Sequence, residues 1–168
     1  MGKMIYVLYG QPGAGKTTLG KMLADYLDTP FIIDGDEFRE MFTNKNYGRA
    51  GREENIKNAN AVATYLNKKG EVGEWKAIYV DVINGWKSHP INQETHVVLS
   101  LVNPYDHLRQ ELKNNNKNQV FEVLLRSSRE LRKEYHVEDF EVGNPDYVID
   151  TDKDLSDTWR QLRKLLKV

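Results

Sequence analysis

The sequence contains no cysteine. This absence excludes disulfide bonds, thiolate metal ligands and cysteine nucleophiles. A chain without disulfides suits a reducing compartment, so we expect a cytoplasmic protein. Met1, Gly2 and Lys3 lead directly into the first expected strand, and we therefore expect no signal peptide.

Long apolar runs and an excess of charge of either sign are also missing. No apolar run approaches the roughly 20 residues that a membrane-spanning helix needs, so we expect no membrane association. The 24 lysine and arginine residues nearly balance the 25 aspartate and glutamate residues, which leaves a net charge of −1. This balance argues against a protein that coats DNA non-specifically. The histidines show no spacing typical of metal ligands, and we expect each to be structural or solvated: His89, His96, His107 and His136.

The sequence does contain a complete phosphate-binding motif, because Gly10 to Thr17 fits G-x-x-x-x-G-K-[ST] without a mismatch. An apolar segment at 4–9, typical of a buried strand, precedes the motif, and a helical pattern follows it. The backbone N–H groups of such a loop cradle phosphates, with the lysine on the β- and γ-phosphates and the threonine hydroxyl on Mg²⁺. We predict that these residues bind ATP and its metal: Gly10, Gln11, Pro12, Gly13, Ala14, Gly15, Lys16, Thr17 and Thr18.

Strand and helix patterns alternate along the chain. We expect strands at 4–9, 31–34, 75–82, 96–102, 120–125 and 147–150, and helices after the phosphate loop and near 37–42, 56–69, 105–113, 127–134 and 155–166. Residues 86–90 are expected to be irregular, and Asp36 to cap the helix that follows it. The alternation predicts one domain, residues 1–168, with the α/β fold of P-loop NTPases: a three-layer α-β-α sandwich with a mostly parallel five-stranded sheet.

Two carboxylates follow the second strand, Asp34 and Asp36, with a glycine between them. One could hold Mg²⁺, and the other could accept a proton from an attacking hydroxyl group. Arg39 lies one helical turn later and could hold an anionic acceptor. Taken alone, Asp36 could equally be a helix cap and Arg39 a solvated surface charge.

These motifs resemble the adenosine 5′-phosphosulfate (APS) kinase family. The segment Asp34-Gly35-Asp36 with Arg39 is similar to that family's Asp-Gly-Asp-x-x-Arg, and 52–57 to its Arg-x-Glu-Asn-Ile-Arg. Residues 100–105 are similar to its Ile-Ser-Pro-Tyr strand end, and 144–151 to its closing Pro-Asp-x-x-x-Asp-Thr. The matches run in order over most of the chain, so the resemblance implies an ATP-dependent kinase of a ribose 3′-hydroxyl.

The resemblance also implies roles for individual residues. Asp36 would be the base or would orient the acceptor, and Asp34 would join Thr17 in the Mg²⁺ site. Lys16, Asp34 and Asp36 are therefore the expected catalytic residues. Arg52 and Asn55 could instead simply begin a long helix. The expected acceptor contacts are Asp36, Phe38, Arg39, Arg52, Asn55, Asn103, Pro104 and Tyr105.

Three departures from the family pattern concern the acceptor. The chain inserts about Glu71 to Glu94, where Trp75, Tyr79 and Trp86 could stack on a base or form a local core or an oligomer contact, which leaves a homodimer open. Asn103 replaces a serine, and Asp106 replaces an arginine. The family's lid motifs are missing. The lid position instead carries a basic segment, and we expect one of its arginines, taken as Arg126, to contact the nucleotide. The basic residues of this segment are Arg126, Arg129, Arg132 and Lys133.

The sequence therefore predicts a kinase that uses ATP and Mg²⁺ to phosphorylate a hydroxyl group of a nucleotide-like acceptor, with the 3′-hydroxyl of APS as first candidate. Other acceptors stay open: a hydroxymethylated base in DNA, a nucleoside monophosphate or a polynucleotide end. The near-neutral charge counts against a nucleic acid. A third hypothesis is a non-catalytic nucleotide-binding module, although such a module would not need the carboxylate pair.

Overall fold

A computed structural model describes residues 2–69, 75–81, 85–91, 95–130 and 132–166. Its main sheet has five strands in the order β2-β5-β1-β6-β7, and all of its neighbouring strands run parallel. This arrangement confirms the expected fold class. The strands are β1 (Ile5–Tyr9), β2 (Ile32–Asp34), β5 (Val97–Leu101), β6 (Val120–Arg126) and β7 (Tyr147–Asp150).

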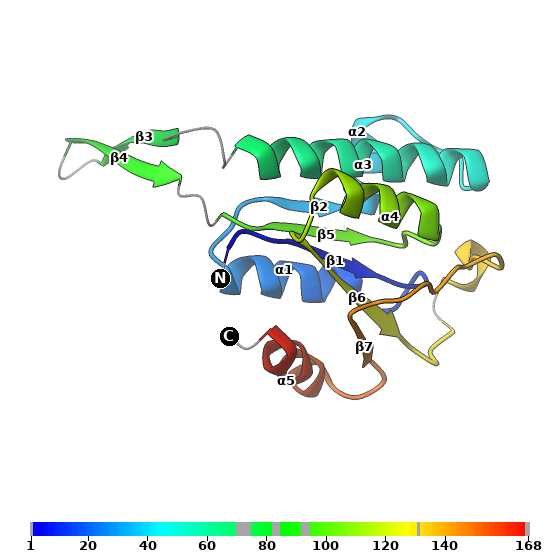
Figure 1. Cartoon of the computed structure of the whole chain (residues 1–168). Coiled ribbons are helices and arrows are strands. Elements are labelled where there is room, and N and C mark those ends of the chain that lie inside the picture. Colours follow the sequence, from blue (N-terminus) through cyan, green and yellow to red (C-terminus); the bar gives the residue numbers. More distant parts are fainter. Residues whose placement is uncertain (1, 70–74, 82–84, 92–94, 131, 167–168) are drawn as a thin grey trace.

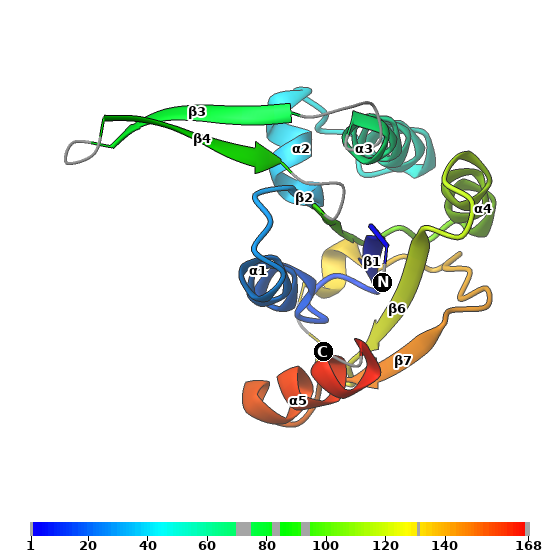
Figure 2. The same cartoon turned by 60° about the vertical axis from the view of Figure 1, so that its left-hand side comes forward.

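Helices cover both faces of this sheet (Figures 1 and 2). On one face lie α1 (Lys16–Tyr26) and α5 (Leu155–Leu166), and on the other lie α3 (Arg49–Lys69) and α4 (Asp106–Asn115). The short helix α2 (Gly35–Met41) follows β2 directly and leads into the loop before α3. No helix in the described part of the chain is long and apolar enough to cross a bilayer.

The central strand β1 explains why the core forms. All five of its residues are buried, because helices pack on both faces of the sheet. Val7 and Tyr9 face the cluster that includes residues of α3 and α4, whereas Tyr6 and Leu8 face the cluster formed with α1 and α5. A continuous apolar strand of this kind places the following loop, residues 10–15, at the carboxyl edge of the sheet.

The inserted segment forms a separate antiparallel hairpin of β3 (Trp75–Asp81) and β4 (Gly85–Ile91), which projects from the body between α3 and β5 (Figures 1 and 2). Residues 86–90 are therefore strand, and the expectation of irregular structure was wrong. Pairing with β3 supplies backbone partners that local periodicity does not reveal. The side chains of Trp75, Tyr79 and Trp86 lie outside those that the structure describes, so base stacking by them stays a prediction.

The segment after β6 also differs from expectation. We expected a helix over 127–134, but the structure has irregular chain at 127–130 and a single 3₁₀ turn at Lys133–Tyr135. Ser127 and Ser128 bind the Asp152 carboxylate instead of capping a helix. Arg132 has a left-handed backbone with φ of 56°, which α-helix propagation does not allow.

Candidate active site

The phosphate loop connects β1 to α1 and is shaped by its glycines. Gly13 and Gly15 have φ values of 84° and 91°, which residues with a Cβ rarely adopt. Gly10 passes so close to β6 that a Cβ there would lie 2.4 Å from the carbonyl oxygen of Leu125. This curvature brings the loop to the N-terminus of α1, where backbone N–H groups are available to an anion.

Lys16 is the first residue of α1 and is buried beneath the loop. Its Nζ donates a hydrogen bond of 2.7 Å to the carbonyl oxygen of Gln11 in the loop itself. Burial lowers the pKa of Lys16 to about 8, and the nearby carboxylate of Asp36 opposes this change. A buried ammonium with few partners is well prepared to bind phosphate oxygens.

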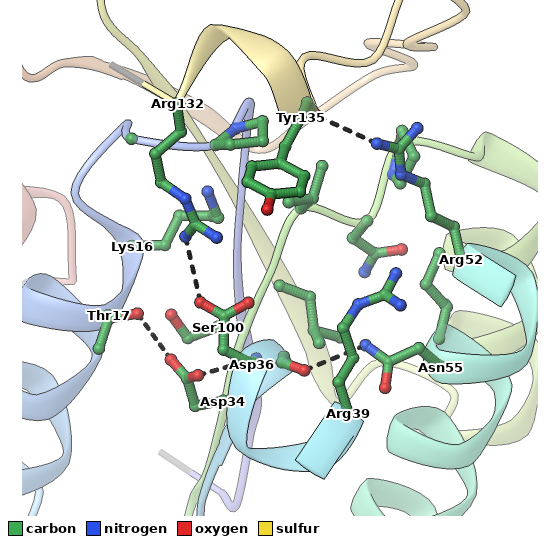
Figure 3. A pocket seen from close by; sticks show the side chains of 18 of the residues that line it. Lys16, Thr17, Asp34, Asp36, Arg39, Arg52, Asn55, Ser100, Arg132 and Tyr135 are labelled. Carbon is green, nitrogen blue, oxygen red and sulfur yellow. Dashed lines mark hydrogen bonds and ion pairs between the residues drawn. The ribbon is translucent and has the colours of Figure 1, made fainter. Parts of the chain in front are cut away.

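Thr17 and Asp34 meet beside Lys16 (Figure 3). The Thr17 hydroxyl donates a 2.6 Å hydrogen bond to Asp34 Oδ2, while Asp34 Oδ1 accepts from the backbone N–H groups of Asp36 and Glu37. Asp34 is therefore the cap of α2, and the assignment of that cap to Asp36 was wrong. Asp34 takes the cap because it is the last residue of β2 and its backbone is still extended.

The chemistry of this pair fits Mg²⁺, which prefers oxygen ligands and keeps several waters alongside one or two protein ligands and the substrate phosphates. Thr17 and Asp34 offer one hydroxyl and one carboxylate next to the phosphate loop. Within the described ranges there is no group of three or more histidine, aspartate or glutamate side chains that could form a metal site made of protein ligands alone.

Asp36 does not cap α2, and its side chain points across the site. Its carboxylate is exposed and forms an ion pair of 3.2 Å with Arg132, which lies 96 residues later in the chain (Figure 3). Arg132 also lies close enough to Lys16 to contribute to the lowering of its pKa. The ion pair therefore joins α2 to the segment that follows β6.

These residues surround a cavity of about 270 Å³. It extends from the phosphate loop to the start of α3 and is bounded by the chain that follows β5. The sequence-predicted residues that line it are Pro12, Gly13, Gly15, Lys16, Thr17, Thr18, Asp34, Asp36, Arg39, Arg52, Asn55, Asn103 and Pro104. The predicted donor and acceptor residues thus share one cavity.

Two of the expected acceptor contacts lie in the core instead. Phe38 is nearly buried and packs against Phe42 and the cluster beneath α3. Tyr105 is fully buried, with the guanidinium of Arg49 over its ring at 4.5 Å. Burial of their large apolar surface stabilises both side chains in the core, although neighbours in sequence line the cavity. Neither side chain therefore lines the cavity.

Three residues of the phosphate motif and Arg126 also fall outside the cavity lining. Gly10 and Ala14 pack against nearby residues of the core, and the side chain of Gln11 points away from the cavity to Val137. Arg126 is exposed at the end of β6 and lines a different cavity of about 650 Å³. Of the basic residues at the expected lid position that the structure describes, Arg132 is the one that reaches the site.

Sequence reasoning missed the aromatic part of the cavity. Tyr47 and Tyr135 both line it, with ring centroids 4.8 Å apart, and the Arg39 guanidinium lies 4.3 Å from the Tyr47 ring centroid. Tyr47 sits in a polar loop and Tyr135 in a charged segment, so no apolar periodicity marks either one. The adjacent Arg52 donates to the Tyr135 carbonyl oxygen at 3.0 Å, which fixes that segment against α3 (Figure 3).

Several polar side chains in the cavity wall have unused hydrogen-bonding capacity. Ser100 Oγ, Asn55 Oδ1 and both polar side-chain atoms of Asn103 are buried and have no hydrogen-bond partner among the residues that the structure describes. Asn55 Nδ2 donates to the Gly35 carbonyl oxygen, which holds α3 against α2. Buried polar groups are usually paired, so these atoms are available for hydrogen bonds to water or to a polar ligand.

The chain has similarity to known proteins over several ranges. The Zeta toxin family model matches residues 2–69, from the N-terminus to the end of α3. An adenylate kinase from Cyanothece sp. is 51% identical over 39 residues, which make up 23% of this chain and only 20% of that protein. This second match therefore covers a small part of either sequence.

Solved structures match over nearly the whole chain. The Mycobacterium tuberculosis APS kinase, solved with AMPPNP and APS, has a TM-score of 0.70 and 16% identity, with 99% of each chain covered. A gluconokinase from Sinorhizobium meliloti has a TM-score of 0.61 and 16% identity, covering 98% of this chain and 91% of that one. The chain thus has the P-loop kinase fold, which kinases of different acceptors share.

Proposed function

We propose that the protein is a kinase that uses ATP and Mg²⁺ to phosphorylate a hydroxyl group of an anionic, nucleotide-like acceptor. The observation that carries this proposal is that Lys16, Thr17 and Asp34 share one cavity with Asp36 and Arg132. The first three are suited to a nucleoside triphosphate and its metal. Asp36 and Arg132 lie next to them, where a second substrate would meet the transferring phosphate.

The donor half follows from the phosphate loop. The loop N–H groups and Lys16 would bind the phosphates of ATP, and Thr17 and Asp34 would hold Mg²⁺, which neutralises charge on the β- and γ-phosphates when it is bound. To reach the phosphates, Lys16 would exchange its hydrogen bond with the Gln11 carbonyl oxygen for bonds to phosphate oxygens. Within the described residues Lys16 forms no ion pair that this exchange would have to break.

The acceptor half is organised by Asp36. The hydroxyl oxygen of the acceptor would attack the γ-phosphorus, the hydroxyl proton would pass to the Asp36 carboxylate, and the bond to the β,γ-bridging oxygen would break to release ADP. Arg132 would leave Asp36 and pair with the transferring phosphoryl group. The ion pair is exposed, so breaking it costs about 0–1 kcal/mol.

APS is the first candidate acceptor. The sequence resembles the APS kinase family, and the structure is similar to an APS kinase. Arg39 and Arg52 could bind its anionic groups, and Tyr47 and Tyr135 could stack on its base. The unpaired polar atoms of Ser100, Asn55 and Asn103 would find partners on such a ligand.

A smaller anionic alcohol is a second candidate, because of the distance between the two tyrosines. Their ring centroids are 4.8 Å apart, whereas a base stacked between two rings needs about 7 Å, twice the usual carbon contact distance. In this conformation the rings fill the space that a base would occupy. A base held between the two rings therefore requires the segment at 132–135 to move, and a smaller acceptor does not.

The test is an acceptor screen that measures ADP release with ATP and Mg²⁺. We expect release above the ATPase background with APS and not with ATP alone. Release only with gluconate or another small anionic alcohol would support the second candidate. Release only with hydroxymethylated DNA, a nucleoside monophosphate or a polynucleotide end would replace both candidates, and ATP binding without release for any acceptor would favour a non-catalytic module.

A further inference from the structure

The side chain of Gln11 makes a contact that phosphate binding does not explain. Its Nε2 donates to the Val137 carbonyl oxygen at 2.8 Å, and its Oε1 accepts from the Val137 N–H at 2.9 Å. One amide thus satisfies both backbone groups of a residue that is 126 positions later in the chain. Val137 is itself buried, so its backbone groups depend on the Gln11 amide for these hydrogen bonds.

The segment that Gln11 holds carries the cavity residues Arg132 and Tyr135. Two backbone hydrogen bonds make this segment a compact turn, from Tyr135 N–H to the Arg132 carbonyl oxygen and from His136 N–H to that of Lys133. At its start Arg132 pairs with Asp36, and at its centre the Tyr135 carbonyl oxygen accepts from Arg52. The turn therefore spans the cavity and is attached to α2, α3 and the phosphate loop.

These attachments differ in strength. The Arg132 ion pair is exposed, and the Arg52 contact is a single hydrogen bond. The Gln11 contact has two hydrogen bonds to a buried backbone, and it comes from the phosphate loop, which its glycines and the start of α1 hold in place. Gln11 is thus the firmest connection between the loop and the turn.

We propose that Gln11 is a positioning residue, which holds the 132–137 turn so that Arg132 and Tyr135 face the acceptor. The inference rests on the proposed kinase function, and it assigns Gln11 a role in acceptor binding and transfer instead of ATP binding. The phosphate loop offers its backbone N–H groups to ATP whatever the side chain at position 11, so loss of the amide affects the two substrates differently.

The test compares Gln11→Met with wild type. Methionine has a similar length but neither hydrogen-bonding group, so it removes both contacts and leaves the loop backbone intact. The matched control is Gln161→Met, which removes one side-chain hydrogen bond within α5, far from the cavity. Amide hydrogen exchange measured by NMR reports the turn directly and does not require turnover.

We expect Gln11→Met to speed amide exchange at Tyr135, His136 and Val137 at least tenfold, and to leave Leu99 in the central sheet unchanged. Exchange that rises only at Val137, or nowhere, would overturn the inference, because the turn would then hold its position without Gln11. This measurement separates the inference from the proposed function, since a protein that phosphorylates no acceptor still gives an exchange result.

With an acceptor that supports transfer, Gln11→Met should raise the acceptor KM about tenfold and lower kcat, while the affinity for AMPPNP stays within threefold of wild type. Gln161→Met should change none of these values. A tenfold loss of AMPPNP affinity would show that Gln11 serves the donor site, and unchanged kcat and KM would show a purely structural contact. Either result would overturn the proposal.

A double variant tests whether Gln11 acts through Arg132. In an Arg132→Ala background, Gln11→Met should lower kcat by less than twofold, since the side chain that it positions is already gone. If the two substitutions instead lower kcat by independent factors that multiply, Gln11 does not act through Arg132 and the inference fails.

Discussion

The two walls of the cavity are built in different ways. The wall that we propose to bind the donor, called the donor wall below, comes from one continuous stretch, the phosphate loop and the first turn of α1, with Asp34 added from the next strand. The wall that we propose to bind the acceptor, the acceptor wall, is assembled from α2, the start of α3, the chain after β5 and the turn at 132–135. The first is held by local backbone geometry, and the second by contacts between segments far apart in sequence.

This difference indicates which features can vary among kinases in each half of the site. A loop whose shape depends on glycines and on the start of a helix is a fixed platform for phosphate, and it serves kinases of many acceptors. The acceptor wall depends on separate side chains, including Arg132, Tyr47 and Tyr135, that can change without altering the platform. Substitutions in the two walls should therefore affect the two substrates separately.

The largest effect is expected from Asp36→Asn. The amide cannot accept the acceptor's proton, so kcat should fall about a thousandfold, and AMPPNP affinity should stay within threefold of wild type. Steady-state kinetics and calorimetric titration measure the two quantities. The exposed neighbour Glu37→Gln is the matched control. A kcat close to that of wild type would show that Asp36 takes no part in the transfer, and it would contradict the proposed difference between the two walls.

Arg132→Ala should lower kcat about a hundredfold, because a guanidinium that stabilises charge on the transferring group is lost. The same substitution should change the free energy of unfolding by less than about 1 kcal/mol, since the ion pair with Asp36 is exposed. Urea unfolding measures the second effect. A large loss of stability with little loss of kcat would instead make Arg132 a structural residue.

Lys16→Met should lower AMPPNP affinity about thirtyfold through loss of a charge-assisted hydrogen bond to phosphate. It should also raise the melting temperature of the protein without nucleotide. Burial lowers the pKa of Lys16 from 10.5 to about 8, so burying the charged form costs about 3 kcal/mol at neutral pH. A variant that binds AMPPNP like wild type would contradict the account of the donor wall.

Tyr47→Leu should raise the KM for a nucleotide acceptor about tenfold by removing a stacking surface, with little change in AMPPNP affinity. The KM for a small acceptor without a base should change less than twofold. Tyr65→Leu, at an exposed position on α3 outside the cavity lining, is the control. Equal effects on acceptors with and without a base would show that Tyr47 does not contact a base.

The smallest effect concerns pH. With its pKa near 8, Lys16 of the free protein loses its proton as the pH rises through 8, whereas bound phosphate favours the protonated form. AMPPNP affinity should therefore fall about fourfold between pH 7 and 8.5, and binding at pH 8.5 should take up a proton. Calorimetry in buffers of different ionisation enthalpy measures that uptake. Binding without proton uptake would contradict the lowered pKa.

The sequence predicts the sheet and the position of the phosphate loop at its edge, because both depend on local patterns. The phosphate motif and the buried strand before it are continuous, and Asp34 lies at the end of the next strand. The alternation of strands and helices is sufficient for the layered fold. Even so, local reasoning assigned the cap of α2 to Asp36, because it could not tell which of two nearby carboxylates still has extended backbone.

The acceptor wall could be predicted only in part. Arg39 was selected from its position one helical turn after Asp36, and Arg52 and Asn55 through a resemblance, and all three line the cavity. Tyr47 and Tyr135 were not selected, because their contact joins a loop to a turn 88 positions later. Sequence reasoning expected one arginine of the basic segment to contact the nucleotide and took Arg126, whereas the left-handed backbone of Arg132 turns the chain so that Arg132 lines the cavity. Such contacts depend on tertiary structure and leave no periodic pattern in the sequence.

The central claim is that one cavity holds both substrates of a kinase. Transfer of labelled γ-phosphate from ATP to APS and the other acceptors of the screen tests it most directly. The account predicts labelled product with the wild-type protein, and none above background with Asp36→Asn although that variant still binds AMPPNP. Absence of labelled product for every acceptor, with normal AMPPNP binding by the wild type, would contradict it.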